Sequence, residues 1–274
     1  MWRGLYTAAS GMITETKRTD TLANNLANAN TAGYKRDEAI NREFEPMLIK
    51  RINDGTVRGD VTSFKGFHVG DNRPTVGTLG LGSYIDEIQT NHEQGGFQTT
   101  GNPLDLAISG DGYFAIQTPQ GVRYTRNGSF FKSANGELQT VNGQRVLARG
   151  GQAGINIPAD AVNITIGAQG QVWVRQAGQD GQNQIGQLEF VSFGPDPRAV
   201  LKQGESLYYP QQGAQPQPAT GTIEQGVLEA SNTNVVSEMV SLINNYRVYE
   251  AGSKAVTTQD SLLDKAVNEV GRLS

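Results

Sequence analysis

Apolar residues recur at alternating spacings of four and three at both ends of the chain, and the middle lacks this pattern. The N-terminal series is Leu5, Ala9, Met12, Thr16, Thr19, Ala23 and Leu26. The C-terminal series is Met239, Leu242, Tyr246, Tyr249, Ser253, Val256, Asp260, Leu263, Val267 and Val270. This alternation is that of a heptad seam, so it predicts two terminal helices that pair as a coiled coil.

The N-terminal seam is the weaker of the two. Two threonines stand at its centre, and Gly11 costs a helix about 1 kcal/mol relative to alanine. Because helices gain most of their stability by packing an apolar face, we expect this helix to be unstable alone. Gly33 is suited to a left-handed position after the helix ends, and residues 232–234 (Asn-Thr-Asn) can cap the C-terminal helix.

Between the two helices, short alternating runs and turn residues predict an all-β region of hairpins and a meander. Asn-Gly pairs at 127–128, 135–136 and 142–143 favour tight hairpins. The strands are expected within 104–108, 113–117, 122–125, 129–131, 138–141, 145–147, 163–166, 171–175 and 187–193. The Gln- and Gly-rich stretches 176–187 and 211–225 are interpreted as long surface loops.

These patterns predict an α+β protein in three parts. Residues 1–45 and 228–274 form a terminal helical region that is available for assembly. Residues 46–97 form an extended connector, and residues 98–227 form the central β domain.

Composition narrows the function classes. The chain has 274 residues, 34 of them glycine and none cysteine, with a net charge of −4. The missing cysteines remove disulfides, thiolate zinc sites and cysteine nucleophiles. Each basic pair is followed closely by acids, which favours a solvated face over a nucleic-acid site. No stretch is long and apolar enough for a membrane span, and the first residues lack the apolar core of a cleaved signal peptide.

A search for chemistry finds no catalytic, cofactor or metal site. His68 and His92 are the only histidines and lack a metal-ligand spacing. Asp105 and Asp111 would be a candidate glycosidase pair, but Asp111 between two glycines is an ordinary turn former. The glycine-rich run 77–82 matches no phosphate-binding loop. We therefore expect no enzyme activity, no cofactor and no small-molecule substrate.

The terminal seams favour assembly over a closed monomer. The N-terminal seam has too few large apolar residues to be satisfied by one neighbour, and no third helix is available. We expect the assembly interface to consist of Leu5, Met12, Leu22, Leu26, Met239, Leu242, Tyr246, Tyr249, Val256 and Leu263.

Three blocks of sequence resemble the bacterial flagellar rod and hook proteins. Residues 23–36 (ANNLANANTAGYKR) are similar to the family's N-terminal signature. Residues 228–235 (LEASNTNV), with 238–240 and 246–250, resemble its C-terminal signature. Residues 101–108, 110–114 and 124–130 are similar to its central β domain.

The resemblance implies a structural subunit of the basal-body rod that polymerises through its terminal helices and transmits torque from motor to hook. It also implies export through the flagellar type III apparatus, a place in the basal body outside the cytoplasmic membrane, and contacts with copies of itself and with other rod and hook subunits. Proximal-rod and distal-rod types both fit. The alternatives are a hook-type axial protein, a peptidoglycan-cleaving β-domain enzyme on a rod-like frame, and a coiled-coil fibre of phage or adhesin type.

Overall fold

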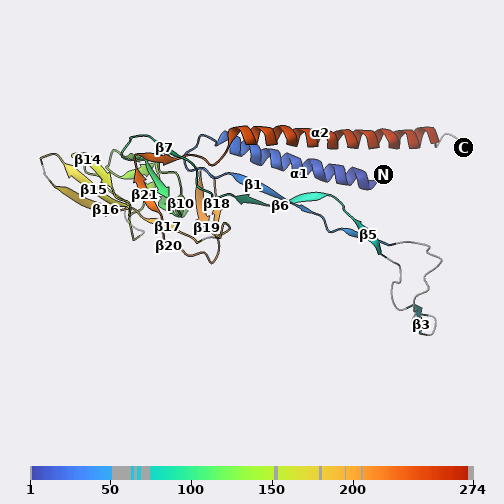
Figure 1. The fold of residues 1–274 in the computed structure, drawn as a ribbon, viewed down its shortest axis with the longest axis horizontal. Coiled ribbons are helices and arrows are strands. Elements are labelled where there is room, and N and C mark those ends of the chain that lie inside the picture. The colour runs from blue at the N-terminus through green and yellow to red at the C-terminus, as the bar shows by residue number, and fades with distance from the viewer. Residues whose placement is uncertain are drawn as a thin grey trace. The chain divides into compact units, whose positions relative to one another are not determined.

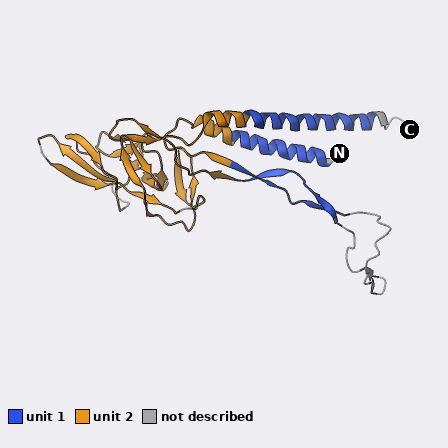
Figure 2. Cartoon of the chain, in the orientation of Figure 1, with its two compact units in different colours: residues 1–20, 39–87, 243–274 blue, residues 21–38, 88–242 orange. Residues whose placement is uncertain are grey.

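The computed structural model describes residues 2–50, 63–64, 67–68, 75–150, 154–178, 181–194, 196–204 and 206–270. They fall into two compact units (Figure 2). We call residues 1–20, 39–87 and 243–274 the helix unit, and residues 21–38 and 88–242 the β unit. Much of the predicted connector, at 51–62, 65–66 and 69–74, lies outside the described residues.

Two long helices form at the chain ends, as the seams predict (Figure 1). Helix α1 spans Trp2–Ala27 and α2 spans Val235–Lys265, followed by a π-helical turn, η1, at Ala266–Val270. The side-chain oxygen of Asn234 accepts a hydrogen bond from the Ser237 amide (3.1 Å), which confirms the predicted cap of α2. No described helix is long and apolar enough to cross a membrane.

Gly33 is left-handed, with φ of 67°, but it does not cap the helix. Helix α1 already ends at Ala27, and Gly33 lies in the turn that leads into the next strand. A Cβ atom there would overlap the backbone of Arg126 and Asn127. Close approach of two chain segments, rather than helix termination, therefore requires this glycine.

The strands between α1 and the β region pair in sequence-distant couples. Strand β1 (Asp37–Glu43) pairs with β6 (Ser83–Thr90), and β2 (Met47–Lys50) pairs antiparallel with β5 (Thr75–Leu79). Strands β3 (Ser63–Phe64) and β4 (Phe67–His68), which are close in the sequence, also pair antiparallel.

The β unit is built on a nine-stranded sheet whose main path runs β11-β12-β13-β9-β10-β19-β18. Strand β9 lies near its centre and pairs with β10, β13 and β17, and β17 also pairs with β20. The strands are β9 (Tyr113–Thr118), β10 (Gly121–Thr125), β11 (Phe130–Lys132), β12 (Leu138–Thr140), β13 (Arg145–Val146), β17 (Phe190–Ser192), β18 (Val200–Lys202), β19 (Leu207–Pro210) and β20 (Gln217–Pro218).

A three-stranded sheet and two strand pairs complete the unit. The sheet contains β14 (Ala161–Ile166), β15 (Gln171–Gln176) and β16 (Gln182–Gln187). Strand β8 (Leu106–Ser109) pairs with β21 (Thr222–Gln225), and β7 (Phe97–Thr99) with β22 (Val227–Glu229). The predicted loops are therefore wrong in part, because β16 lies in 176–187 and both β20 and β21 lie in 211–225.

The Asn-Gly prediction is confirmed at two of its three sites. Gly136 and Gly143 have positive φ and join the meander β11-β12-β13. Gly128 makes no hairpin turn, because the strands on either side of it, β10 and β11, do not pair with each other. A Cβ there would strike the Leu106 backbone, and Ser129 bridges to Asp105. At this site glycine allows close packing against the neighbouring backbone.

Two apolar clusters form the core of the β unit. The larger contains Leu106, Phe114, Ile116, Phe130 and ten further buried aliphatic neighbours, among them Leu138. The smaller is aromatic and is centred on Tyr113, Tyr124 and Tyr208.

Candidate assembly interface

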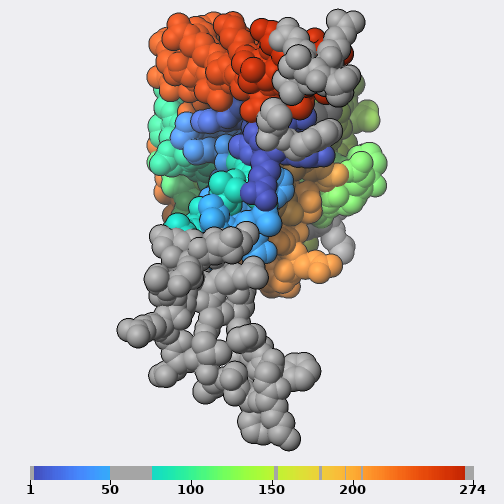
Figure 3. All heavy atoms as spheres, turned by 90° about the vertical axis from the view of Figure 1, so that its right-hand side faces the viewer, coloured from blue at the N-terminus to red at the C-terminus, as the bar shows by residue number. Residues whose placement is uncertain are grey.

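Helices α1 and α2 run antiparallel within the helix unit (Figure 1), and the end-on view of Figure 3 shows the orange-red atoms of α2 next to the blue atoms of α1. The Asn245 side-chain amide donates to the Glu15 carbonyl oxygen (2.7 Å) and to the Thr19 hydroxyl. A Cβ on Gly252 would lie 2.9 Å from Met12 Cγ, and one on Gly4 would lie 2.6 Å from Gln259 Nε2. The residue numbers of the contacting positions rise along α1 as they fall along α2, which is the order of an antiparallel pair. The glycines at positions 4 and 252 let the two helices approach closely.

The inner seam of α2 is more polar than the sequence pattern indicates. Its less exposed positions are Glu238, Ser241, Leu242, Asn245, Gly252, Ser253, Val256, Gln259 and Leu263. Side-chain oxygens of Asn245 and Gln259 are buried there without a hydrogen-bond partner. Unpaired buried acceptors are costly, so the paired helices have a poorly satisfied interior within a single chain.

The ten residues expected at the assembly interface divide between the seam and the surface. Leu5, Met12, Leu22, Leu26, Leu242, Val256 and Leu263 are partly buried. Met239, Tyr246 and Tyr249 are exposed. The residues just before Met239 and Tyr246, which are Glu238 and Asn245, are the buried ones, and Asn245 bonds to α1. The sequence pattern could not separate a seam through Met239 and Tyr246 from a seam through Glu238 and Asn245, because each position of the second lies one residue before that of the first.

A stripe of large apolar side chains covers the outer face of α2. It consists of Val236, Met239, Val240, Ile243 and Tyr246, spaced three or four apart, as on one helix face. Ile243 is 52% exposed and Tyr246 is 57% exposed. We call these five residues the outer stripe. An apolar face of this kind is typical of a protein–protein contact.

Helix α1 also lines an apolar groove in the helix unit. The Thr14 hydroxyl donates to the Ser83 carbonyl oxygen (3.0 Å), which holds one face of α1 beside the start of β6. The adjoining groove, of about 770 Å³, is lined by Arg3, Tyr6, Ala9, Ser10, Ile13, Phe44, Glu45 and Leu81. Tyr6 and Ile13 remain 67% and 62% exposed.

The final turns of α1 are anchored within the β unit. The Asn25 side chain makes two hydrogen bonds to the Asp37 backbone, 2.8 and 2.9 Å long. The Tyr34 hydroxyl lies 3.0 Å from the Asn24 side-chain oxygen, and the Lys202 ammonium lies 3.6 Å from the centre of the Tyr34 ring. Burial and the neighbouring Asp37 carboxylate raise the pKa of Tyr34. Heptad analysis missed these residues, although they fall in or beside the N-terminal signature.

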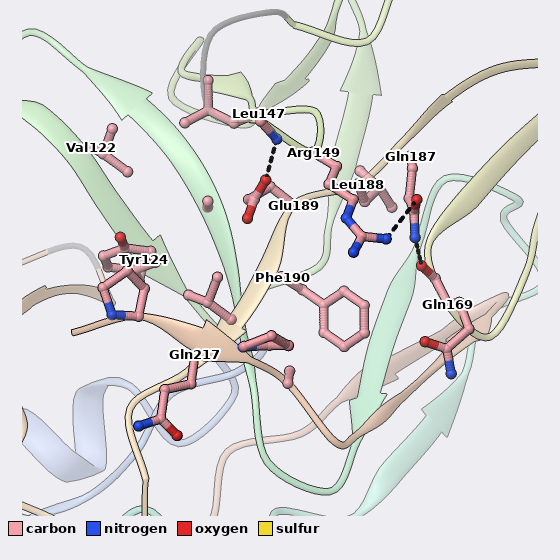
Figure 4. Close-up of a pocket in the computed structure, with 16 residues that line it drawn as sticks. Val122, Tyr124, Leu147, Arg149, Gln169, Gln187, Leu188, Glu189, Phe190 and Gln217 are labelled. Atoms are coloured by element: carbon pink, nitrogen blue, oxygen red, sulfur yellow. Dashed lines mark hydrogen bonds between the residues drawn. The ribbon is translucent and has the colours of Figure 1, made fainter.

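A pocket in the β unit has no catalytic arrangement (Figure 4). It measures about 630 Å³, and Glu189 supplies the only carboxylate among its sixteen described lining residues. Its Oε2 accepts the Gly150 amide (2.7 Å), and Arg149 donates to Gln187 (3.3 Å). A glycosidase needs two facing carboxyl groups, which this pocket does not offer.

The other candidate chemistry residues have local structural roles. His92 Nε2 donates to the Pro197 carbonyl oxygen (3.2 Å), and its Nδ1 accepts from the Tyr113 hydroxyl (2.9 Å). Burial lowers the pKa of His92, which suits this neutral tautomer. Asp105 is buried and accepts from Asn102 (3.1 Å). Within the described ranges no group of His, Asp or Glu is placed to bind a metal ion.

Comparison with known proteins gives matches along the whole chain. The family model "Flagella basal body rod protein" matches residues 5–35, and "Flagellar hook protein FlgE/F/G D1 domain" matches residues 107–174. A third, "Flagellar basal body rod FlgEFG protein C-terminal", matches residues 224–269.

Individual relatives match over nearly their full length. The flagellar basal-body rod protein FlgG of Bacillus subtilis is 37% identical, over 98% of this chain and 99% of the relative. FlgG of Agrobacterium fabrum is 36% identical, over 95% and 96%. The flagellar hook-basal body complex protein FlhO of Bacillus subtilis is 32% identical over the whole of both chains.

Proposed function

This chain belongs to the family of flagellar basal-body rod proteins, and we propose that it assembles by burying the outer stripe of α2 against neighbouring subunits. It is a structural subunit of the basal body, it contacts other rod and hook subunits, and it is not an enzyme. The partners at the stripe, and the part that each helix plays, belong to the proposal.

The observation that carries the proposal is the unburied apolar surface of the two terminal helices. The outer stripe and the α1 groove both present large apolar side chains that no described part of the chain covers. Burying each such side chain stabilises an assembly by roughly 1.5–3 kcal/mol before the entropy cost of association. Repeated at every subunit, this contribution favours a polymer.

Copies of this chain are the simplest partners. The stripe and the groove are different surfaces of one molecule, and a contact between different surfaces is heterologous, so it repeats into an open helical polymer. Met239, Tyr246 and Tyr249 would then contact neighbouring copies, while Leu5, Met12, Leu22, Leu26, Leu242, Val256 and Leu263 would stabilise each pair. A tube made of such interlocked pairs would resist twisting and so transmit torque.

The polar interior of the helix pair supports a second part of the proposal, export before assembly. A subunit must pass through the narrow channel of the flagellar export apparatus with its ends loosely folded. Buried, unpaired oxygens such as those of Asn245 and Gln259 weaken the isolated pair. Packing by neighbours would then supply the stability that the free subunit lacks.

The test replaces Ile243 by aspartate. Ile243 is exposed, so a charge there should leave the free subunit folded but place an unpaired charge inside the assembled interface. We expect basal bodies without a complete rod in electron micrographs, and loss of motility, with unchanged thermal unfolding of the purified subunit. Asn244→Asp, which adds the same charge at an exposed polar position next to Ile243, is the control and should assemble normally. Normal rods from the Ile243 variant would refute the outer stripe as the interface.

A further inference from the structure

A fully buried carboxylate in the β unit joins three segments that are far apart in the sequence. Glu229, at the end of β22, has a side-chain exposure of 0%. Its Oε1 lies 2.6 Å from Lys35 Nζ and accepts the Gly95 amide (3.0 Å), and its Oε2 lies 3.5 Å from Arg126 Nη1. Lys35 belongs to the segment after α1, and Arg126 follows β10. We call Lys35, Arg126 and Glu229 the Glu229 cluster.

Backbone carbonyl groups satisfy most of the remaining donors of the cluster. Lys35 Nζ donates to the Glu93 carbonyl oxygen (2.7 Å), and Arg126 Nη2 donates to that of Gly110 (2.9 Å). The backbones of the two terminal segments also meet here, where the Gly33 amide donates to the Glu229 carbonyl oxygen (2.7 Å). The cluster thus lies where the segment leaving α1 crosses the segment entering α2.

Further contacts extend the cluster to the first turns of α2. The Asn232 side-chain oxygen accepts the Arg36 amide (2.8 Å), and the Arg36 guanidinium lies 3.9 Å from the Glu238 carboxylate. Lys202, on edge strand β18, donates to the Asp37 carboxylate and to the Lys35 carbonyl oxygen, both at 2.9 Å. Charged contacts therefore connect the bases of both helices to the sheet within a single unit.

We propose that Glu229 is the positioning residue that fixes the bases of α1 and α2 on the β unit in a single arrangement. A buried ion pair adds little net stability, because desolvation offsets its attraction, but removing one partner leaves a buried charge uncompensated. Sliding either terminal segment by one residue would produce this unpaired charge. The cluster therefore selects one register, and in the assembled rod it would pass twist from the helices into the β unit.

The consequence can be measured on the free, full-length chain and does not depend on assembly. Glu229→Gln keeps the size of the side chain but removes its charge. We expect amide hydrogen exchange in residues 21–37 and 230–242 to become at least tenfold faster, while the amides of β9 and β10 keep their rates. Glu137→Gln, which breaks the partly exposed 2.9 Å ion pair with Arg145 in the same unit, is the matched control and should change neither region.

A double variant separates positioning from general stability. Lys35→Met with Glu229→Gln removes the unpaired ammonium that the single variant leaves buried. We expect its melting temperature to recover toward that of the wild type, while exchange at the helix bases stays fast because the register is no longer selected. If exchange recovers together with the melting temperature, the cluster only stabilises the fold and the proposal fails.

Two other results would also overturn the proposal. Unchanged exchange at the helix bases of the Glu229→Gln chain would show that the charge positions nothing. Equal acceleration at the helix bases and in β9 and β10 would show a global loss of stability. If the single variant does not fold, the double variant alone decides, by whether its helix bases exchange faster than those of the wild type.

Discussion

The two units of this chain differ most in what they bury. Every buried apolar residue among the described ones belongs to the β unit, whereas the buried residues of the helix unit are the polar Thr14 and Asn245. The β unit therefore has the core of a self-sufficient domain. The helix unit has amphipathic elements without a fully buried apolar residue among the described ones, and several of its large apolar side chains, such as Tyr6, Ile13 and Ile243, are exposed. The difference indicates that one unit folds alone and that the other completes its fold in the assembly.

Truncating one large apolar side chain in each unit should give the largest contrast. Phe114 is fully buried and packs edge-to-face on Phe130, with ring centres 5.2 Å apart. Phe114→Ala should cost about 3–5 kcal/mol of unfolding free energy. Ile13→Ala, at an exposed position of α1, should change it by less than about 0.5 kcal/mol. Chemical denaturation of the free subunit measures both, and a comparable loss from Ile13→Ala would mean that the helix unit has a core of its own.

Alanine at two glycines should give effects of opposite sign. Gly33→Ala places a Cβ at positive φ and against the Arg126 backbone, so it should destabilise the β unit by about 1–3 kcal/mol. At Gly11, in the helix unit, no atom lies within 4 Å of an added Cβ. Gly11→Ala should therefore stabilise the helix by about 1 kcal/mol and raise the helical circular dichroism of the free subunit. Equal effects at the two positions would contradict the assigned local structures.

A smaller effect should appear in the pH dependence of the β unit. Burial lowers the pKa of His92 in the folded state below its ordinary value of 6.5, and the Lys35 and Arg126 charges act in the same direction while Asp37 opposes them. The unfolded chain therefore binds the proton more readily, so folding stability falls as the pH drops below about 6.5 toward the lowered pKa. Protonation of Nδ1 would also break its hydrogen bond from Tyr113.

Thermal unfolding between neutral and mildly acid pH checks this prediction. His92→Gln should reduce the loss of melting temperature as the pH falls, because the variant lacks the titrating group. The same substitution at His68, the only other histidine in the sequence, is the control and should keep the wild-type slope. If the wild type and the His92 variant decline in parallel, His92 is not the group responsible.

Local patterns in the sequence predicted the elements well. The spacing of apolar residues identified both helices, Asn234 identified the start of α2, and the glycines at 136 and 143 identified two turns. These features depend on neighbouring residues alone. The paired strands inside the Gln-rich stretches were missed because their polar composition resembles that of a loop. Strand β16 pairs with the strand just before it, β15, whereas the partner of β21, β8, lies far away in the sequence.

The candidate sites depended more on tertiary structure. An apolar seam is the natural choice in a heptad pattern, yet α2 turns Glu238 and Asn245 inward and leaves Met239 and Tyr246 outside. Which face of α2 packs on α1 depends on the close approach at Gly252 and on the hydrogen bonds from Asn245 to α1. These contacts cannot be predicted from the sequence of either helix alone. The Glu229 cluster was also missed because it depends on tertiary structure. Its three members are far apart in the sequence and meet only in the folded β unit.

Hydrogen exchange on the verified monomer, compared with the assembled rod, tests the central claim most directly. The account predicts strong protection in β9 and β10 of the free subunit, and fast exchange in residues 2–20 and 243–265 that slows at least tenfold on assembly. Protection of those helical amides in the free monomer at the level of β9 and β10 would contradict it.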